Sequence, residues 1–197
     1  LWQWGQFLDH DLSLVDTKAP FEPAHIRPKT GDPFFDPNGT GLSQIDFFRS
    51  KNHPGTGIDP AYPRQQINTI THFIDASHVY GSDPGRAAAL RTNDGTGRLK
   101  VSAGDMLPFN EEGLANGGGT GPELFVAGGV RTNEQVGLTV MHTLFVREHN
   151  RRAAEIRASD PGLSDEEIYE RARAFVGGLM QGITYNEFLP ALLGPNA

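Results

Sequence analysis

The stretch WGQFLDHDLSLVD, residues 4–16, places an aspartate on each side of a histidine within an apolar helical pattern. Apolar side chains recur at helical spacing and predict a helix over residues 1–14: Trp4, Phe7, Leu8 and Leu12. Asp9 and Asp11 lie about 100° to either side of His10 around such a helix, so they face different partners. The pattern has two interpretations. In the simpler interpretation, the two carboxylates are exposed to solvent and the histidine has ordinary hydrogen-bond partners. In the other, this face of the helix lines an active site.

The composition is that of a globular protein of 197 residues, which is long enough for one domain with a core. The formal net charge of −7 argues against a nucleic-acid partner, because phosphate binding requires a basic face. No apolar run reaches about 18 residues, so we expect no membrane span. The chain contains no cysteine, which excludes a disulfide scaffold, thiolate catalysis and cysteine-based zinc sites.

Long irregular segments separate the expected helices. Proline and glycine are frequent over residues 16–66, which predicts a loop with turns and a short helix near Gln44–Arg49. The β-branched and aromatic alternation that follows predicts an extended segment up to Asp75. Residues 92–123 have the composition of turns and loops, with a hairpin expected around Leu99–Met106.

The clearest helical pattern covers residues 133–158. Its apolar stripe consists of Val136, Val140, Leu144 and Phe145, and its charged side of Arg147, Glu148, Arg151 and Arg152. A shorter helix is expected to begin at Pro84, because proline suits the first helical position after an N-cap such as Ser82 or Asp83.

A further helix is predicted where the sequence reads SDEE, because Ser164 and Glu167 have the spacing of a capping box. The segment ITYNEFLPALLG after it predicts a short helix that is broken at Pro190. These elements together predict a mainly α, multi-helical fold with long loops and little β-structure.

Oxygen-bearing residues alternate in the segment after residue 70. Thr71, Phe73, Asp75 and Ser77 are two residues apart, so in an extended segment all four lie on one side. Hydroxyl, carboxylate and backbone carbonyl oxygens are the ligands that Ca²⁺ prefers, and Asp11 is a candidate for a further carboxylate. A polar edge strand is the alternative interpretation, since alternation is also typical of half-buried strands.

Gln6 and His10 are four residues apart and share a helix face, so an amide and an imidazole can reach one cavity. Histidine is the natural general base near neutral pH. A different class of enzyme, a metal-dependent phosphohydrolase that uses His10 and Asp11, would need further histidine and aspartate ligands on facing helices, and the sequence offers none in a convincing position.

Arg131 and Glu134 lie where the long helix begins. A buried guanidinium can stabilise developing negative charge, although a loop arginine beside a first-turn glutamate is also common. His142 and His149 are seven residues apart on one helix face. They could form a metal pair, but a polar network that packs the helix through residues 147–150 is the better interpretation.

Five segments, taken in order, resemble the signature segments of the animal-type heme peroxidases, the peroxidase–cyclooxygenase superfamily: WGQFLDHD, THFIDASHVYGS, GGVRTNE, MHTLFVREHNR and ITYNEFLPALLG. The resemblance runs from the first residue to the last. It implies the multi-helical fold of that family and a heme-dependent enzyme, which uses hydrogen peroxide to oxidise a halide, a pseudohalide or a small organic donor.

The resemblance also implies a role for each candidate residue. The catalytic residues on the distal side of the heme would be His10, Arg131 and Gln6. The carboxylates that form ester bonds to heme b would be those of Asp9 and Glu134. The calcium ligands would be Asp11, Thr71, Phe73 through its carbonyl, Asp75 and Ser77. His10 would take a proton from peroxide and return it to the leaving oxygen, while Arg131 would stabilise the developing charge.

Two departures from the family pattern carry expectations of their own. Gln135 stands where some members have a methionine that links to a heme vinyl group, so no sulfonium link is expected. None of the seven histidines has the sequence context of the proximal iron ligand. We therefore expect residues 1–197 to be the distal-side part of a single larger catalytic domain, with the remainder of that domain as a partner.

The main alternative from another class is a calcium-stabilised, catalytically inert relative that serves adhesion or binding. The joint presence of His10, Arg131, Asp9 and Glu134 argues against it. An extracellular or exported location is implied by the family, and the lack of cysteine is compatible with a bacterial relative.

Overall fold

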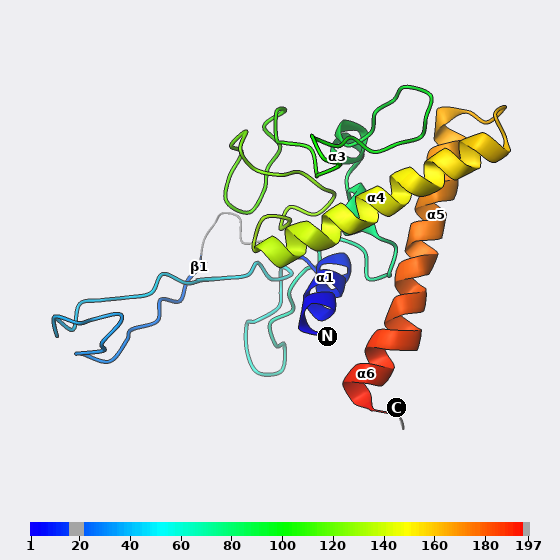
Figure 1. Cartoon of the computed structure of the whole chain (residues 1–197). Helices are drawn as coiled ribbons and strands as arrows, with labels where there is room; N and C mark the ends of the chain where they lie inside the picture. Colours follow the sequence, from blue (N-terminus) through cyan, green and yellow to red (C-terminus); the bar gives the residue numbers. More distant parts are fainter. Residues whose placement is uncertain (16–21, 195–197) are drawn as a thin grey trace. The chain divides into compact units, whose positions relative to one another are not determined.

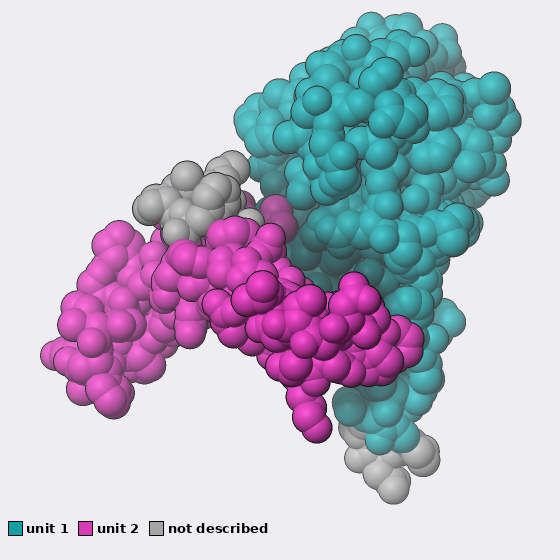
Figure 2. Space-filling view, turned by 90° about the vertical axis from the view of Figure 1, so that its left-hand side faces the viewer, with its two compact units in different colours: residues 1–13, 70–197 teal, residues 14–69 magenta. Residues whose placement is uncertain are grey.

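The computed structural model describes residues 1–15 and 22–194. The chain divides into two compact units, one formed by Leu1–Ser13 with Ile70–Ala197 and the other by Leu14–Thr69, which Figure 2 colours separately. All the residues singled out for chemistry belong to the first unit, so this unit is the one that positions the candidate site.

The first unit is helical. Its elements in chain order are α1 (Trp2–Leu12), α2 (Ser77–Tyr80), α3 (Pro84–Ala89), α4 (Val136–Ser159), α5 (Asp165–Ile183), a π-helical turn (Thr184–Phe188) and α6 (Leu189–Leu193). Helices α4 and α5 pack side by side as a hairpin, and α1 packs against α4 (Figure 1). The mainly α class predicted from the sequence is confirmed.

The helix ends follow the capping signals. Ser164 and Glu167 form a complete capping box at the start of α5, and the Asp83 carboxylate accepts a hydrogen bond from the Arg86 amide in front of Pro84. Helix α4 begins at Val136, three residues later than the sequence pattern suggested, because the side chain of Gln135 caps it by accepting from the Gly137 amide. These caps confirm the three predicted helices.

The buried face of α4 differs from its predicted apolar stripe. Phe145 is buried, but Val136, Val140 and Leu144 are 79%, 57% and 54% exposed. The buried residues of α4 are instead Leu138, Thr139, His142, Thr143, Phe145, Val146, His149, Asn150 and Ala153. Two histidines and an asparagine therefore take positions that a hydrophobicity pattern assigns to apolar residues.

Pro190 does not break the C-terminal helix, contrary to the prediction. The five-residue π-helical turn lies immediately before α6, and Pro190 occupies the first turn of that helix. A proline in a helix interior loses one backbone hydrogen bond and crowds the carbonyl of the preceding turn. The wider turn accommodates this, so the helix axis continues into α6.

The segment before α2 is a series of bends and not the extended strand that the alternation suggested. Ala76 takes the left-handed conformation, with φ of 60°, and α2 starts directly after it. The left-handed conformation raises the free energy of a residue that has a side chain. Contacts with the surrounding residues must therefore stabilise Ala76 in this conformation. The segment 92–131 is irregular, and the hairpin expected near Leu99–Met106 is reduced to a single bridge between Ser102 and Met106.

The second unit has little regular structure, as expected for its proline and glycine content. Its two short strands, β1 (Glu22–Pro23) and β2 (Phe48–Arg49), pair antiparallel with Glu22 opposite Arg49. The helix expected near Gln44–Arg49 is therefore wrong, and part of the predicted loop, residues 16–21, lies outside the described residues. The buried Asp36 carboxylate organises one turn by accepting from the amides of Gly31, Thr40 and Gly41.

Candidate functional site

Phe7 anchors the helix that carries the candidate residues. Its ring is completely buried and stacks on Phe145 of α4, with centroids 5.3 Å apart and planes 13° from parallel. The edges of His78 and His142 lie against the same ring, at 4.1 and 5.0 Å. Because Phe7 locks α1 between α2 and α4, the next turn of α1 presents its side chains in fixed directions.

His10 is buried one turn further along, with 7% of its surface exposed. Its Nε2 atom lies 3.9 Å from a carboxylate oxygen of Glu134, and its Nδ1 atom has no hydrogen-bond partner among the described residues. Burial and the nearby Arg131 guanidinium lower the pKa of His10 to about 4, against an opposing effect of Asp9. The imidazole is therefore neutral at physiological pH and has a lone pair with which to accept a proton.

Arg131 reaches α1 from the loop before α4. Its guanidinium donates to the carbonyl oxygens of Ser13 and His10, and its Nη1 atom lies 4.0 Å from the Asp9 carboxylate. Burial lowers the pKa of this guanidinium, which remains charged because arginine starts from so high a value. Asp9 itself also accepts a hydrogen bond from the Ser13 hydroxyl, at 2.9 Å, and leaves most of its side chain exposed.

Two glycines bring the arginine loop to this place. The amides of Gly128 and Gly129 donate to the carbonyls of Val79 and His78, so the loop runs directly against α2. A Cβ atom on Gly128 would lie 2.2 Å from the Gly81 amide nitrogen, which no side chain can tolerate. Glycine is required at this position by the close backbone approach, and Arg131 follows three residues later.

Gln6 lies one turn before His10, and Gln135 holds its side chain. The sequence analysis noted Gln135 only because it stands where some members of the family have a methionine. The side-chain amide of Gln135 donates to the Oε1 atoms of both Gln6 and Gln3, each at 2.9 Å. The Oε1 atom of Gln135 is occupied by the Gly137 amide. The orientation of the Gln6 amide is thereby fixed, with its oxygen toward Gln135 and its NH₂ group left to donate elsewhere.

Asp11 points away from His10 into the protein, as the helical spacing predicted. Its carboxylate is completely buried and accepts from the amides of Asp75, Ala76 and His78, from the Ser77 hydroxyl, and from the His78 ring at 2.7 Å. Burial opposes ionisation, but these hydrogen bonds hold the pKa of Asp11 below its ordinary value. They also explain how Ala76 is kept in its left-handed conformation.

The other predicted calcium ligands lie along the same loop. The Thr71 hydroxyl donates to the Asp75 carboxylate at 3.1 Å, the Ser77 amide donates to the same carboxylate at 2.9 Å, and the Phe73 carbonyl accepts from the Asp75 amide. Two carboxylates with hydroxyl and carbonyl oxygens match the chemistry that calcium requires. No group of three or more His, Asp or Glu side chains suited to a metal ion occurs among the residues described, so the calcium site stays a prediction.

His78 is a buried residue that sequence reasoning missed at this site, and His142 had been considered only as half of a metal pair with His149. The sequence placed His78 only within a family segment, and the Asp11 partner 67 residues away could not be read from it. His149, the other half of the possible metal pair, instead bonds the Tyr80 hydroxyl and the Gly97 carbonyl, while Asn150 bonds the Leu99 backbone. These two residues form the packing network that was the preferred interpretation.

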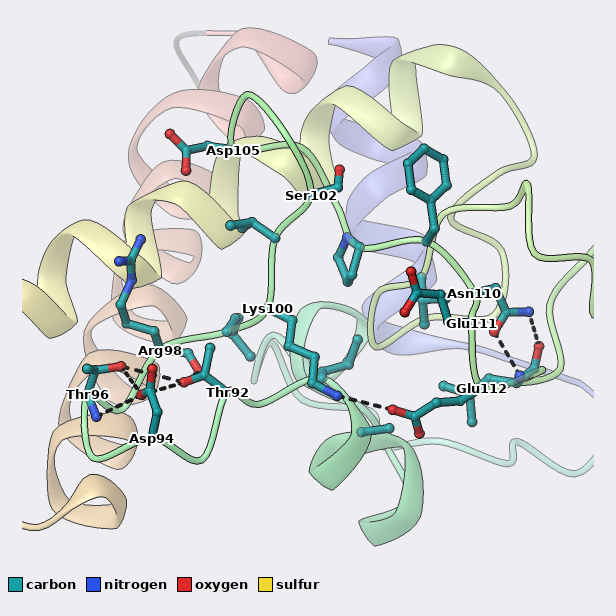
Figure 3. A pocket seen from close by; sticks show the side chains of 18 residues that line it. Thr92, Asp94, Thr96, Arg98, Lys100, Ser102, Asp105, Asn110, Glu111 and Glu112 are labelled. Carbon is teal, nitrogen blue, oxygen red and sulfur yellow. Dashed lines mark hydrogen bonds and ion pairs between the residues drawn. The ribbon is translucent and has the colours of Figure 1, made fainter.

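A cavity of about 520 Å³ lies elsewhere in the first unit, beside α3 and the loop that follows it (Figure 3). Its polar wall includes an ion pair between Lys100 and Glu112 and the turn in which Asp94 accepts from Thr92 and Thr96. None of the predicted site residues lines it. The candidate site is therefore defined by the residues around His10, with Arg131 bonded to the His10 carbonyl and Gln6 one turn earlier on α1, and not by cavity size.

Comparisons with known proteins identify the family of this chain. A family model described as "Animal haem peroxidase" matches residues 1–197. Peroxidasin of Drosophila melanogaster is 36% identical over 98% of this chain and 14% of its own length. Eosinophil peroxidase of Mus musculus is 37% identical over 98% of this chain and 30% of its own length. Myeloperoxidase of Homo sapiens is 37% identical over 99% of this chain and 29% of its own length.

Solved structures give the same result for the fold. Peroxidase A from Dictyostelium discoideum matches with a TM-score of 0.84 at 30% identity, over 95% of this chain and 39% of that protein. A fatty acid alpha-dioxygenase from Arabidopsis thaliana matches with a TM-score of 0.68 at 26% identity, over 92% of this chain and 26% of that protein. The chain thus spans well under half the length of each of these proteins. None of these similar proteins supports the expectation of a bacterial source.

Proposed function

The chain belongs to the animal heme peroxidase family, and on that premise we propose that its first unit forms the distal side of the active site of a peroxidase. The enzyme would use hydrogen peroxide to oxidise a halide, a pseudohalide or a small organic donor. The observation that carries the proposal is a buried, neutral His10 within reach of Glu134 and beside the guanidinium of Arg131.

The residues present fit a heme on this side. Asp9 and Glu134 carry partly exposed carboxylates, with 60% and 42% of their side chains accessible; Asp9 lies 4.0 Å from Arg131 and Glu134 lies 3.9 Å from His10. These carboxylates would hold the heme and form the ester bonds to it that the resemblance implies. When bound, heme b supplies the iron that breaks the peroxide bond and exchanges electrons with the donor.

His10 handles the proton. Its Nε2 atom faces the side on which Glu134 lies, and its neutral ring can take a proton from hydrogen peroxide. The same nitrogen then returns that proton to the oxygen that departs as water. A positioned general acid–base group of this kind accelerates a reaction by about 10²–10⁴-fold.

Arg131 and Gln6 orient the peroxide and stabilise charge. Two backbone carbonyls hold the Arg131 guanidinium in place, so its positive charge is preorganised for the negative charge that develops as the O–O bond breaks. Gln135 occupies the Oε1 atom of Gln6, so the Gln6 NH₂ group is available to donate to peroxide or water.

Asp11 would connect this chemistry to calcium. We infer that Ca²⁺ binds the oxygens of Asp11, Thr71, Phe73, Asp75 and Ser77. Two contacts support this set, since the Ser77 hydroxyl donates to Asp11 and the Thr71 hydroxyl donates to Asp75. Because Asp11 follows His10 directly in α1, an ion at this position would tie the distal base to the segment before α2.

The remainder of the catalytic domain would supply the proximal ligand of the iron. The exposed apolar side chains of Val136, Val140 and Leu144 on α4 are consistent with a further contact surface for that part. We propose that both units belong to this single catalytic domain.

We also propose an extracellular or exported location, because the family implies it. No helix among the described residues is long and apolar enough to cross a membrane.

Spectroscopy of the full-length protein tests the proposal. We expect a Soret band after reconstitution with heme and peroxide-dependent oxidation of guaiacol. A full-length protein that binds no heme, or binds it without any peroxide-dependent oxidation, would favour the inert adhesion or binding protein instead. The phosphohydrolase alternative is disfavoured because the side chains of His10 and Asp11 contact different partners, Glu134 for His10 and His78 for Asp11.

A further inference from the structure

Arg86 is a buried arginine that none of the proposed catalytic steps uses. Helix α3 has the sequence PGRAAA, so Arg86 is its only long side chain, and 6% of the residue is exposed. The four hydrogen bonds that its guanidinium donates among the described residues all go to uncharged oxygens. Burying a charge is unfavourable unless the charge is well hydrogen-bonded, and a buried apolar side chain is often at least as stable. The position therefore requires a reason beyond packing.

The guanidinium joins two loops. Its Nε atom donates to the Ala127 carbonyl at 2.7 Å, and its Nη2 atom donates to the Gly129 carbonyl at 3.3 Å. Nη1 donates to the Ala115 carbonyl at 2.8 Å, and Nη2 also donates to the side-chain oxygen of Asn116 at 2.7 Å. The flat guanidinium has five N–H groups that point in fixed directions, so it can serve several acceptors at once.

One of these loops carries Arg131. The Gly129 carbonyl, which accepts from Arg86, also accepts from the Thr132 hydroxyl at 2.8 Å. Thr132 is completely buried, and its own carbonyl accepts from the Thr139 hydroxyl of α4 at 2.9 Å. Arg131 therefore lies between two anchored residues, Gly129 two positions before it and Thr132 directly after it.

The other loop reaches the residue next to Arg131. Gly117 follows Asn116 directly, and its amide donates to the Val130 carbonyl at 2.7 Å. The carbonyl immediately before Arg131 is thus held by a loop that Arg86 itself holds. Two separate routes lead from one guanidinium to the backbone on the N-terminal side of Arg131.

We propose that Arg86 is a positioning residue for Arg131, which it keeps in place by holding both loops. The inference rests on the proposed function, in which Arg131 stabilises the negative charge that develops on peroxide. The Arg131 guanidinium donates to the carbonyls of Ser13 and His10, and these bonds require the loop backbone to lie at a fixed distance from α1. A displacement of about 1 Å at a site can lower a rate by about 10²-fold, so a loose loop would weaken the action of Arg131.

The experiment uses the full-length, heme-loaded protein and compares Arg86→Met with Arg91→Met as the matched control. Only 14% of the Arg91 side chain is exposed, and its guanidinium donates to the carboxylates of Asp165 and Glu166. Both of these belong to α5 and not to the two loops. Either variant should therefore lower Tm, but only Arg86→Met releases the loops.

Two measurements separate positioning from stability. Hydrogen exchange of the amides in residues 124–134, followed by mass spectrometry, reports on the Arg131 loop and does not depend on heme. The affinity of fluoride for the ferric heme reports on the Arg131 guanidinium without turnover, because a nearby positive donor stabilises a bound anion.

For Arg86→Met we expect amide exchange in residues 124–134 to be about 10-fold faster and fluoride to bind about 10-fold more weakly, with an unchanged Soret band. Arg91→Met should keep the wild-type values of both. An unchanged fluoride affinity in Arg86→Met, whatever its Tm, would overturn the inference. Weaker fluoride binding without faster exchange would also contradict it, because the charge of Arg86 would then act on the anion directly.

Arg86→Lys is the second variant, in case Arg86→Met fails to fold. It keeps the charge and most of the side chain, but one ammonium group cannot reach the acceptors of both loops. Exchange and fluoride binding should change in the same directions by about 3-fold, and wild-type values would contradict the proposal. If neither variant folds, a crystal structure of the wild-type protein decides. Arg86 bonded to both loops supports the inference, and a guanidinium that points into solvent contradicts it.

Failure of this inference differs from failure of the proposed function, and Arg131→Leu distinguishes them. If Arg131→Leu weakens fluoride binding and Arg86→Met does not, only the positioning role of Arg86 is wrong. If Arg131→Leu leaves fluoride affinity unchanged, the role proposed for Arg131 is wrong. Faster exchange in Arg86→Met would then still show that Arg86 holds the loop.

Discussion

The side-chain nitrogen of Gln135 lies 2.9 Å from the Oε1 atom of Gln6, across 129 residues of sequence. The same side chain caps α4 through the Gly137 amide. One glutamine therefore connects the start of the longest helix to the orientation of a distal-side amide. This relationship ties the position of Gln6 to the backbone of α4.

Replacing Gln135 by leucine should act on both functions. Loss of the cap is expected to lower the free energy of unfolding by about 1 kcal/mol, measured by chemical denaturation. Loss of the hydrogen bond to Gln6 should weaken binding of azide to the ferric heme, since the Gln6 amide is then free to turn. Gln3→Leu, which removes only the other acceptor of Gln135, is the matched control and should leave azide affinity unchanged. An unchanged azide affinity in Gln135→Leu would remove Gln135 from the site.

Calcium should stabilise the wild-type protein through Asp75. We expect addition of Ca²⁺ after treatment with a chelator to raise Tm, because an ion that binds only the folded state stabilises it. The Asp75→Ala variant should lose this increase. Asp94→Ala, which removes a carboxylate that bonds Thr92 and Thr96 outside the predicted site, should keep it. A calcium response that survives in Asp75→Ala contradicts the assignment.

The ester bonds to heme can be tested separately from activity. Asp9 and Glu134 carry the carboxylates that lie nearest Arg131 and His10. Extraction with acidified butanone removes heme that is not covalently bound, so heme of the wild-type protein should remain with the polypeptide after peroxide treatment. In a variant with both Asp9→Asn and Glu134→Gln, heme should be extracted completely. Complete extraction from the wild-type protein would show that no ester forms.

The stability of the fold should decrease in acid partly through His149. Burial lowers the pKa of His149 to about 4, against the effect of its hydrogen bond to the Gly97 carbonyl. The unfolded chain then binds more protons between pH 6.5 and 4, so this group stabilises the fold above pH 6.5 and loses its contribution as the pH falls. The loss reaches roughly 3 kcal/mol.

His149→Gln should accordingly flatten the decrease in the free energy of unfolding between pH 6.5 and 4, as measured by denaturation at each pH. His53→Gln, on an exposed position of the second unit, is the comparison and should show the wild-type slope. An equally steep decrease in His149→Gln and in wild type would show that His149 is not buried in its neutral form.

Local signals allowed much of the fold to be predicted. The capping box at Ser164, the proline at position 84 and the apolar spacing around Phe7 depend on neighbours within one or two turns, and the structure confirms them. The π-helical turn before Pro190 was not predicted, because proline signals strain without stating how the chain relieves it. The prediction that Val136, Val140 and Leu144 form the buried face of α4 was wrong, because the spacing of apolar residues does not show which other part of the protein packs on them.

The candidate site was predictable only in part and for the same reason. Helical spacing correctly separated the directions of His10 and Asp11, and the family resemblance supplied Arg131. The contacts that determine the chemistry join residues far apart in sequence, such as Asp11 with His78 and Gln6 with Gln135. Position in the sequence alone does not reveal such pairs. The left-handed Ala76 follows from the donors around Asp11 and not from its own residue type.

The central claim is that His10 is the distal general base, and the rate at which the full-length, heme-loaded protein reacts with hydrogen peroxide tests it most directly. For His10→Ala with an intact Soret band we predict a rate 10²–10⁴-fold below that of the wild-type protein, about the full value of a positioned acid–base group. A rate equal to that of the wild-type protein would contradict the account.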